Sequence, residues 1–336
     1  MIVRPAGNWF RLLFIWNGSV LQSIIPQLIF MGAVSSLAVL TQGRIFGEKI
    51  PLNTAPFTLF GLALAIFLAF RNNASYERFN EARHLWGNLL ISARALTSQM
   101  LCYVPRNAEK LHLAHTMIAC VYALKHQLRG TDPTADLLRF LGRTRTEALQ
   151  HTCYKPVALL NDIRRDFADL LRFLGRTRTE ALQRTCYKPT ALLNDLRRDF
   201  ADLQVRALMS DTKLWMFDAQ INELGKTIGG CERISSTPIP FSYSVLLHRT
   251  VYAYCVLLPF GLVDSTEFFT PLLCVFISYT LIALEAIASE VAEPFSIAPN
   301  ALALDAMSRN IERSILELCG CELPDEVMPT RSYQLT

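Results

Sequence analysis

The sequence predicts an all-α membrane protein, in which four membrane-spanning helices continue into a cytoplasmic helical bundle. Three observations predict this class. Of the 336 residues, 51% are hydrophobic and 18% are charged, which is too apolar for an ordinary soluble domain and too charged for a bundle buried wholly in the membrane. Long apolar stretches alternate with charged segments. No stretch alternates between apolar and polar residues for long enough to predict a strand.

The predicted spans are residues 19–40, 55–70, 241–263 and 268–292. The second is shorter than the roughly 20 residues that cross the hydrocarbon layer. It carries no charge and runs without a breaker into a charged cluster that begins at Arg71. We therefore expect one long helix that leaves the bilayer and continues into water.

Positive charge is concentrated in the long middle segment, residues 71–236, which carries 25 of the 33 Lys and Arg residues. Cytoplasmic segments of membrane proteins carry an excess of these residues. Arg4 and Arg11 before the first span and Arg309 and Arg313 after the last agree with this orientation. Both termini and the middle segment are therefore expected in the cytoplasm.

The middle segment has apolar residues at helical spacing. One helix is expected over residues 108–128 and another over 211–224, the latter ending near Gly225, Gly229 and Gly230. Glycine lowers helix stability, which makes it a common end point.

A direct repeat lies between these two helices: residues 135–167 and 168–200 match at thirty of 33 positions. Helical repeat proteins need about three or more copies to stack stably. Two near-identical copies therefore indicate a recent tandem duplication, natural or introduced, in which the spare copy protrudes as a helical hairpin.

No motif of an enzyme, a phosphate-binding loop or a dinucleotide site is found in the sequence. His112 and His115 lie three residues apart on a predicted helix, and Cys319 and Cys321 form an isolated Cys-x-Cys motif. No further ligands complete a metal site at either place. The net charge is only +4, and each Arg-Arg pair in the repeat is followed by Asp, which favours a solvated helix face. No enzyme activity, cofactor, metal or nucleic-acid partner is predicted.

Three apolar residues of the second span, Leu62, Ile66 and Phe70, stand four apart and share one helix face. In a symmetric ring of such helices they would form stacked apolar collars, which can gate by dewetting. Apolar stripes on spanning helices more often pack against their neighbours, so the stripe by itself leaves both interpretations open.

Four sequence blocks resemble the bacterial branch of the bestrophin family of ion channels. The characteristic one is FRNNASYERFNEARHLWG, residues 70–87; the others are residues 16–20, 236–264 and 290–318. The resemblance implies a homopentamer around one central pore, with Leu62, Ile66 and Phe70 as its hydrophobic neck. It also implies a second, cytosolic constriction, which we place at Lys213.

Two sets of charged residues bear on how such a channel would work. Animal bestrophins hold calcium with an acidic cluster after the last span, where this chain has Asp305 as its only carboxylate over residues 295–305. Calcium prefers six to eight oxygen ligands, so calcium gating is not expected. The charged residues after the neck have mixed signs: Glu77, Arg78, Glu81 and Arg83. Charged residues beside a bilayer more often form ion pairs between subunits than selectivity filters.

The sequence therefore predicts a pentameric channel for small monovalent ions in the bacterial inner membrane, whose partners are its own copies, lipid and permeant ions. The family resemblance implies chloride or other anions, but an apolar neck does not by itself select the sign of the ion. The alternative is a membrane-anchored scaffold or sensor that conducts nothing and binds a partner through its cytoplasmic helices.

Overall fold

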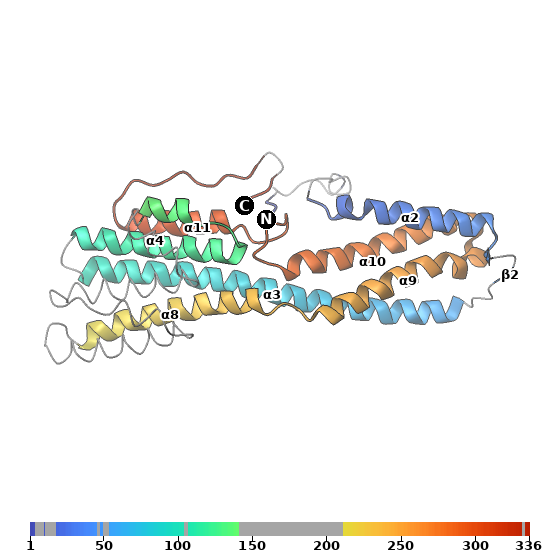
Figure 1. Cartoon of the computed structure of the whole chain (residues 1–336), viewed down its shortest axis with the longest axis horizontal. Helices are drawn as coiled ribbons and strands as arrows, with labels where there is room; N and C mark the ends of the chain where they lie inside the picture. The colour runs from blue at the N-terminus through green and yellow to red at the C-terminus, as the bar shows by residue number, and fades with distance from the viewer. Residues whose placement is uncertain are drawn as a thin grey trace.

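The computed structural model describes residues 1–3, 10, 18–45, 48–49, 54–103, 107–140, 211–330 and 333–336. The molecule is an elongated rod of near-parallel helices (Figure 1). Helix α3, Thr54–Tyr103, runs along most of this length and belongs to both halves of the rod. A helix of this size is roughly 75 Å long, well over twice the hydrocarbon thickness of a bilayer. The prediction of one continuous helix through the second span is confirmed.

One half of the rod contains the most apolar helices. They are α2 (Leu21–Leu40), the first part of α3, α9 (Phe241–Thr266) and α10 (Thr270–Ala292). Helix α10 contacts each of the others. The buried side chains of this half form one apolar core, which includes Met31, Leu64, Leu68, Val251 and Ile282. Two short strands, β1 (Arg44–Ile45) and β2 (Glu48–Lys49), pair at the far end between α2 and α3.

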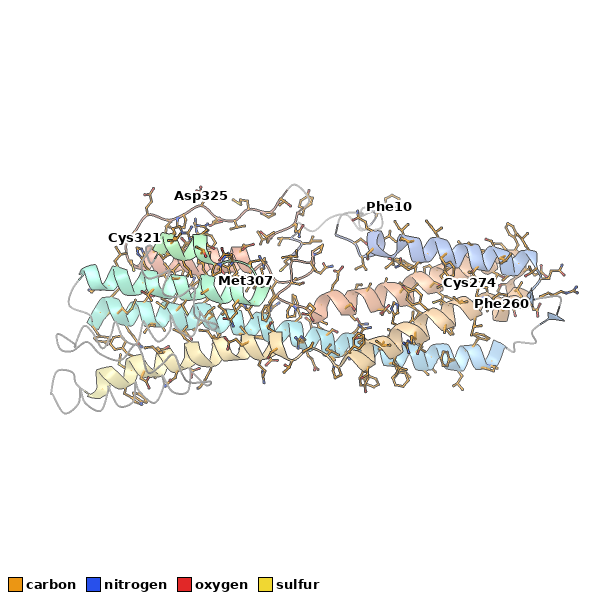
Figure 2. All side chains as sticks on the ribbon, in the orientation of Figure 1. Phe10, Phe260, Cys274, Met307, Cys321 and Asp325 are labelled. Atoms are coloured by element: carbon orange, nitrogen blue, oxygen red, sulfur yellow. The ribbon has the colours of Figure 1, made fainter. Side chains whose placement is uncertain are left out.

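The other half contains the second part of α3 with α4 (Asn107–Arg129), α8 (Asp211–Ser236) and α11 (Leu304–Leu318). Its separate core is built around the buried residues Trp86, Leu96, Met117, Ile221 and Ile315. Figure 2 shows Phe260 and Cys274 at the far end of the apolar half, remote from Met307 and Cys321 in this second half. Helix α3 contributes buried residues to both cores.

Among the residues that the structure describes, three helical stretches are long and apolar enough to cross a membrane: Leu21–Leu40, Ala55–Tyr103 and Phe241–Ala292. The third is interrupted by the short helix η2, Glu267–Phe269, where the chain reverses between α9 and α10. Helices α9 and α10 then pack against each other.

The expected end of the helix near Gly225, Gly229 and Gly230 is wrong, because α8 continues to Ser236. A β-carbon at Gly230 would lie 2.8 Å from the Leu85 side chain of α3. The missing side chain therefore lets α8 approach α3 closely, and this packing outweighs the low helix propensity of glycine.

Candidate functional site on helix α3

The neck residues predicted from the sequence lie on an exposed face of α3. Leu62, Ile66 and Phe70 are 60%, 49% and 67% exposed. The opposite face of the same turns is buried, with Leu64 at 2% and Leu68 at 1% exposed. The packing interpretation of this stripe therefore does not hold within one chain, because the core of the apolar half uses the other face of the helix.

Directly after Phe70, Arg71 turns inward and is 7% exposed. Its Nη1 lies 3.5 Å from Oε1 of Glu285 on α10, and its Nη2 donates to the Ser289 hydroxyl at 3.0 Å. Nδ1 of His248 on α9 lies 3.0 Å from the same Glu285 oxygen. Burying a charge is costly unless it is paired and hydrogen-bonded. The network therefore holds α3, α9 and α10 together one residue past Phe70.

The structure separates the four charges that follow the neck. Arg78 donates to backbone carbonyl groups at the ends of two helices: Ala292 at 2.7 Å, Thr237 at 2.6 Å, and Ile234. A helix C-terminus leaves carbonyl groups without partners and carries partial negative charge, so one guanidinium stabilises the ends of both α8 and α10.

Glu81 forms an ion pair with Arg233 of α8. Glu77 and Arg83 are exposed. Among the described residues, neither has a hydrogen bond or an ion pair. The sequence alone could not show which of these four charges are paired, because the partners of Arg78 and Glu81 lie far away along the chain.

Asp305, the only carboxylate of residues 295–305, forms ion pairs with two basic side chains of α4. Its Oδ1 lies 3.1 Å from Lys125 Nζ, and its Oδ2 lies 2.7 Å from Arg129 Nη1. Burial acts to raise the pKa of Asp305, but the hydrogen bonds and positive charge of Arg129 and Lys125 hold the pKa below its ordinary value. A calcium ion here would have to displace both cations.

Lys125 also contacts Asp136 at 3.1 Å. The hydrogen bond from His126, at 2.9 Å, is the largest cause that lowers the pKa of Asp136 to about 2, and the charge of Lys125 acts in the same direction against burial. Asp136 belongs to the first repeat copy, so the start of that copy is docked on α4.

A second buried carboxylate, Glu312 of α11, was not predicted from the sequence. It is 3% exposed and accepts a hydrogen bond from Tyr122 at 2.6 Å. Arg139 and Arg309 lie 2.9 and 3.2 Å from its oxygens. Burial, with the Glu312 contact, raises the pKa of Tyr122 above its ordinary value. This set joins α4, the first repeat copy and α11, and no local sequence pattern marks it.

Lys213, the predicted cytosolic constriction, lies in the first turn of α8, and its side chain is outside the described part of the structure. Most of the repeat, from residue 141 through the second copy, is also outside the described residues. Within the described residues, no group of three or more His, Cys, Asp or Glu side chains could hold a metal ion.

The sequence model of the Bacterial/Fungal Bestrophin protein family matches this chain over residues 1–172 and 165–317. The chain belongs to the bestrophin family. The two matched segments overlap where the two repeat copies meet, at residues 167 and 168.

Several relatives of this bestrophin are similar over nearly their whole length. A Ralstonia nicotianae protein named a voltage-dependent anion channel-forming protein is 40% identical, and the alignment covers 95% of each chain. Escherichia coli YneE, which carries the same name, is 36% identical with full coverage of both chains. The crystal structure of a bacterial bestrophin homolog from Klebsiella pneumoniae superimposes with a TM-score of 0.76 at 35% identity. It covers 89% of this chain and 99% of that chain. The predominantly helical fold and the membrane character of the chain follow from these similarities and from its apolar helices.

Proposed function

We propose that this bestrophin is a homopentameric channel for small monovalent ions, with one α3 helix from each subunit lining a central pore. Leu62, Ile66 and Phe70 form the neck of that pore. Each subunit crosses the bacterial inner membrane four times, through α2, the first part of α3, α9 and α10.

The exposed stripe on α3 is the observation that carries this proposal. Three large apolar side chains face away from the core of their own chain. They lie on α3, the helix that runs from the apolar half of the rod into the other half. Contact with lipid could cover the apolar stripe of a single helix. However, α3 continues beyond the stripe as a charged segment in the second half of the rod. A ring of these helices encloses the stripe, and an ion at the apolar collars must shed water with nothing to replace it.

A groove between α3 and α9 supports association with further copies. It has a volume of about 670 Å³ and is lined almost wholly by apolar side chains, including Phe60, Phe67, Tyr243 and Leu246. Exposed apolar surface of this kind is typical of protein–protein or membrane contacts. Five copies and their closure in a ring agree with the family expectation and with cyclic symmetry.

The position of the termini supports their placement in the cytoplasm. Ile2 forms a bridge with Gln334, and the backbone nitrogen of Ala306, at the start of α11, donates to the Thr336 carbonyl at 2.9 Å. Both ends of the chain therefore lie near the start of α11, where the charged half of the rod begins (Figure 1). The names of the relatives make anions the first candidate for the permeant ion. A constriction at Lys213 stays a prediction.

The test is ion flux through the purified protein in lipid vesicles, with a salt gradient across the membrane. We expect a conductance that empty vesicles lack, and a reversal potential displaced toward the anion equilibrium potential. A correctly assembled pentamer that passes no ions would overturn the proposal and leave the scaffold or sensor interpretation.

A further inference from the structure

The face of α3 that carries the neck residues continues below them to a carboxylate. An α-helix turns about 100° per residue, so Glu77, eleven residues after Ile66, lies about 20° from it around the helix axis. Glu77 follows Phe70 by two turns, a distance of roughly 10 Å along the axis. Asn73, exposed on the turn between them, is uncharged. Glu77 is therefore the first charged group of this face beyond the neck.

The neighbouring charges are directed elsewhere. Arg71 is buried against Glu285, and the Arg78 guanidinium donates to three backbone carbonyl groups. Glu81 is paired with Arg233. Arg83 is exposed, but it lies about 100° from Ile66 around the helix. What the sequence shows as a cluster of mixed sign therefore presents, among the described residues, one carboxylate without an ion pair on the neck face.

Glu77 lines a shallow cleft that two basic side chains share. Arg78 and Arg233 both line it with Glu77, together with Glu81 and Pro238. Each of these cations has another acceptor: the ends of α8 and α10 for Arg78, and Glu81 for Arg233. Within the described residues, no cation forms an ion pair with Glu77.

From this arrangement we propose that Glu77 is a specificity-determining residue of the channel. The inference rests on the proposed pentameric pore. Symmetry repeats the side chain in every subunit, so the cytoplasmic exit of the neck carries a ring of carboxylates. Such a ring raises the local concentration of cations and repels anions. It therefore opposes the anion preference that the names of the relatives suggest.

The experiment measures the reversal potential of the reconstituted full-length protein in a potassium chloride gradient. Glu77→Gln should raise the anion-to-cation permeability ratio by roughly threefold or more, since several like charges act on one ion at short range. The shift should shrink at high salt, because the Debye length falls from about 10 Å at 0.1 M to about 3 Å at 1 M. Glu77→Asp keeps the charge and should keep the wild-type ratio.

Arg83→Gln is the matched control, because it removes an exposed charge of the same helix that lies off the neck face, and it should leave the ratio unchanged. If Glu77→Gln conducts with the wild-type ratio at low salt, the assignment is overturned while the channel stands. If Glu77→Gln fails to assemble and Glu77→Asp assembles, Glu77 is an inter-subunit contact and the assignment is again overturned. Absence of current in the wild-type protein would instead remove the proposed function itself.

Discussion

Arg71 of α3 and Glu285 of α10 form an ion pair inside the apolar half of the protein, with 3.5 Å between Nη1 and Oε1. The pair lies one residue beyond Phe70, on the opposite side of α3 from the neck face. A buried, paired charge and a surface proposed for conduction thus occupy adjacent positions of one helix. The orientation of the Phe70 face is therefore coupled to α10 through a buried contact.

Removing one partner of this pair should destabilise the protein. Glu285→Gln leaves the Arg71 charge buried without a counter-charge, which costs roughly 3–5 kcal/mol. We expect a lower melting temperature in detergent. The control is Glu223→Gln, which removes an exposed i,i+3 pair with Lys226 and should change stability by less than about 1 kcal/mol. Equal melting temperatures for the two variants would show that Arg71 does not need Glu285.

Shortening the middle neck residue should increase the current. Ile66→Ala removes a β-branched side chain from the proposed constriction, which widens it and lets water enter. Single-channel conductance in planar bilayers measures the change. Ile29→Ala is the matched control, because Ile29 is 68% exposed on α2, outside the proposed pore. Unchanged conductance in an assembled Ile66→Ala pentamer would remove Ile66 from the gate.

Flux should not depend on micromolar calcium. Both oxygens of Asp305 already contact cations, Lys125 at 3.1 Å and Arg129 at 2.7 Å, and calcium prefers six to eight oxygen ligands. The same vesicles are measured with calcium and with a chelator. Asp305→Asn should lower the melting temperature without creating a calcium response. Activation by calcium that disappears in this variant would contradict the prediction.

The purified protein should form a closed ring of five subunits. One chain offers a single neck helix, so collars around a pore require several copies, and a repeated heterologous contact ends in a ring when its rotation closes. Mass measurement in detergent, by light scattering or native mass spectrometry, tests this. Only monomers or dimers would rule out the channel as well as the ring.

One repeat copy should be dispensable. The first copy is docked by its start, where Leu137 is 1% exposed and Arg139 contacts Glu312. The second copy repeats these residues as Leu170 and Arg172. The Klebsiella pneumoniae structure leaves about a tenth of this chain unmatched, which is the length of one copy. Insertions into surface connections cost little closure entropy.

Deleting residues 168–200 should therefore leave expression, pentamer assembly and flux essentially intact. Deleting residues 135–167 instead should give the same result, because it leaves a near-identical copy in the same place. Loss of the ring or the current in both deletions would mean that both copies are integrated into the fold. The placement of the cytosolic constriction at Lys213 would then fall too.

The sequence by itself determined the membrane character, the long α3 helix and the fact that Leu62, Ile66 and Phe70 share one of its faces. Each of these depends on local properties: the length of an apolar run, the absence of a breaker, and the spacing of Leu62, Ile66 and Phe70 along one helix. Local spacing fixes which residues share a face, but not whether that face is buried.

The tertiary structure decided which of these helix faces are buried and which charges are paired. The core of the apolar half takes Leu64 and Leu68 and leaves the Ile66 face outward, and α8 passes Gly230 because Leu85 packs there. Arg71 and Glu285 are separated by more than 200 residues in the chain, so their pairing has no sequence signature. The energy of a buried charge depends on the groups that the fold places around it, and only packing in three dimensions supplies those groups.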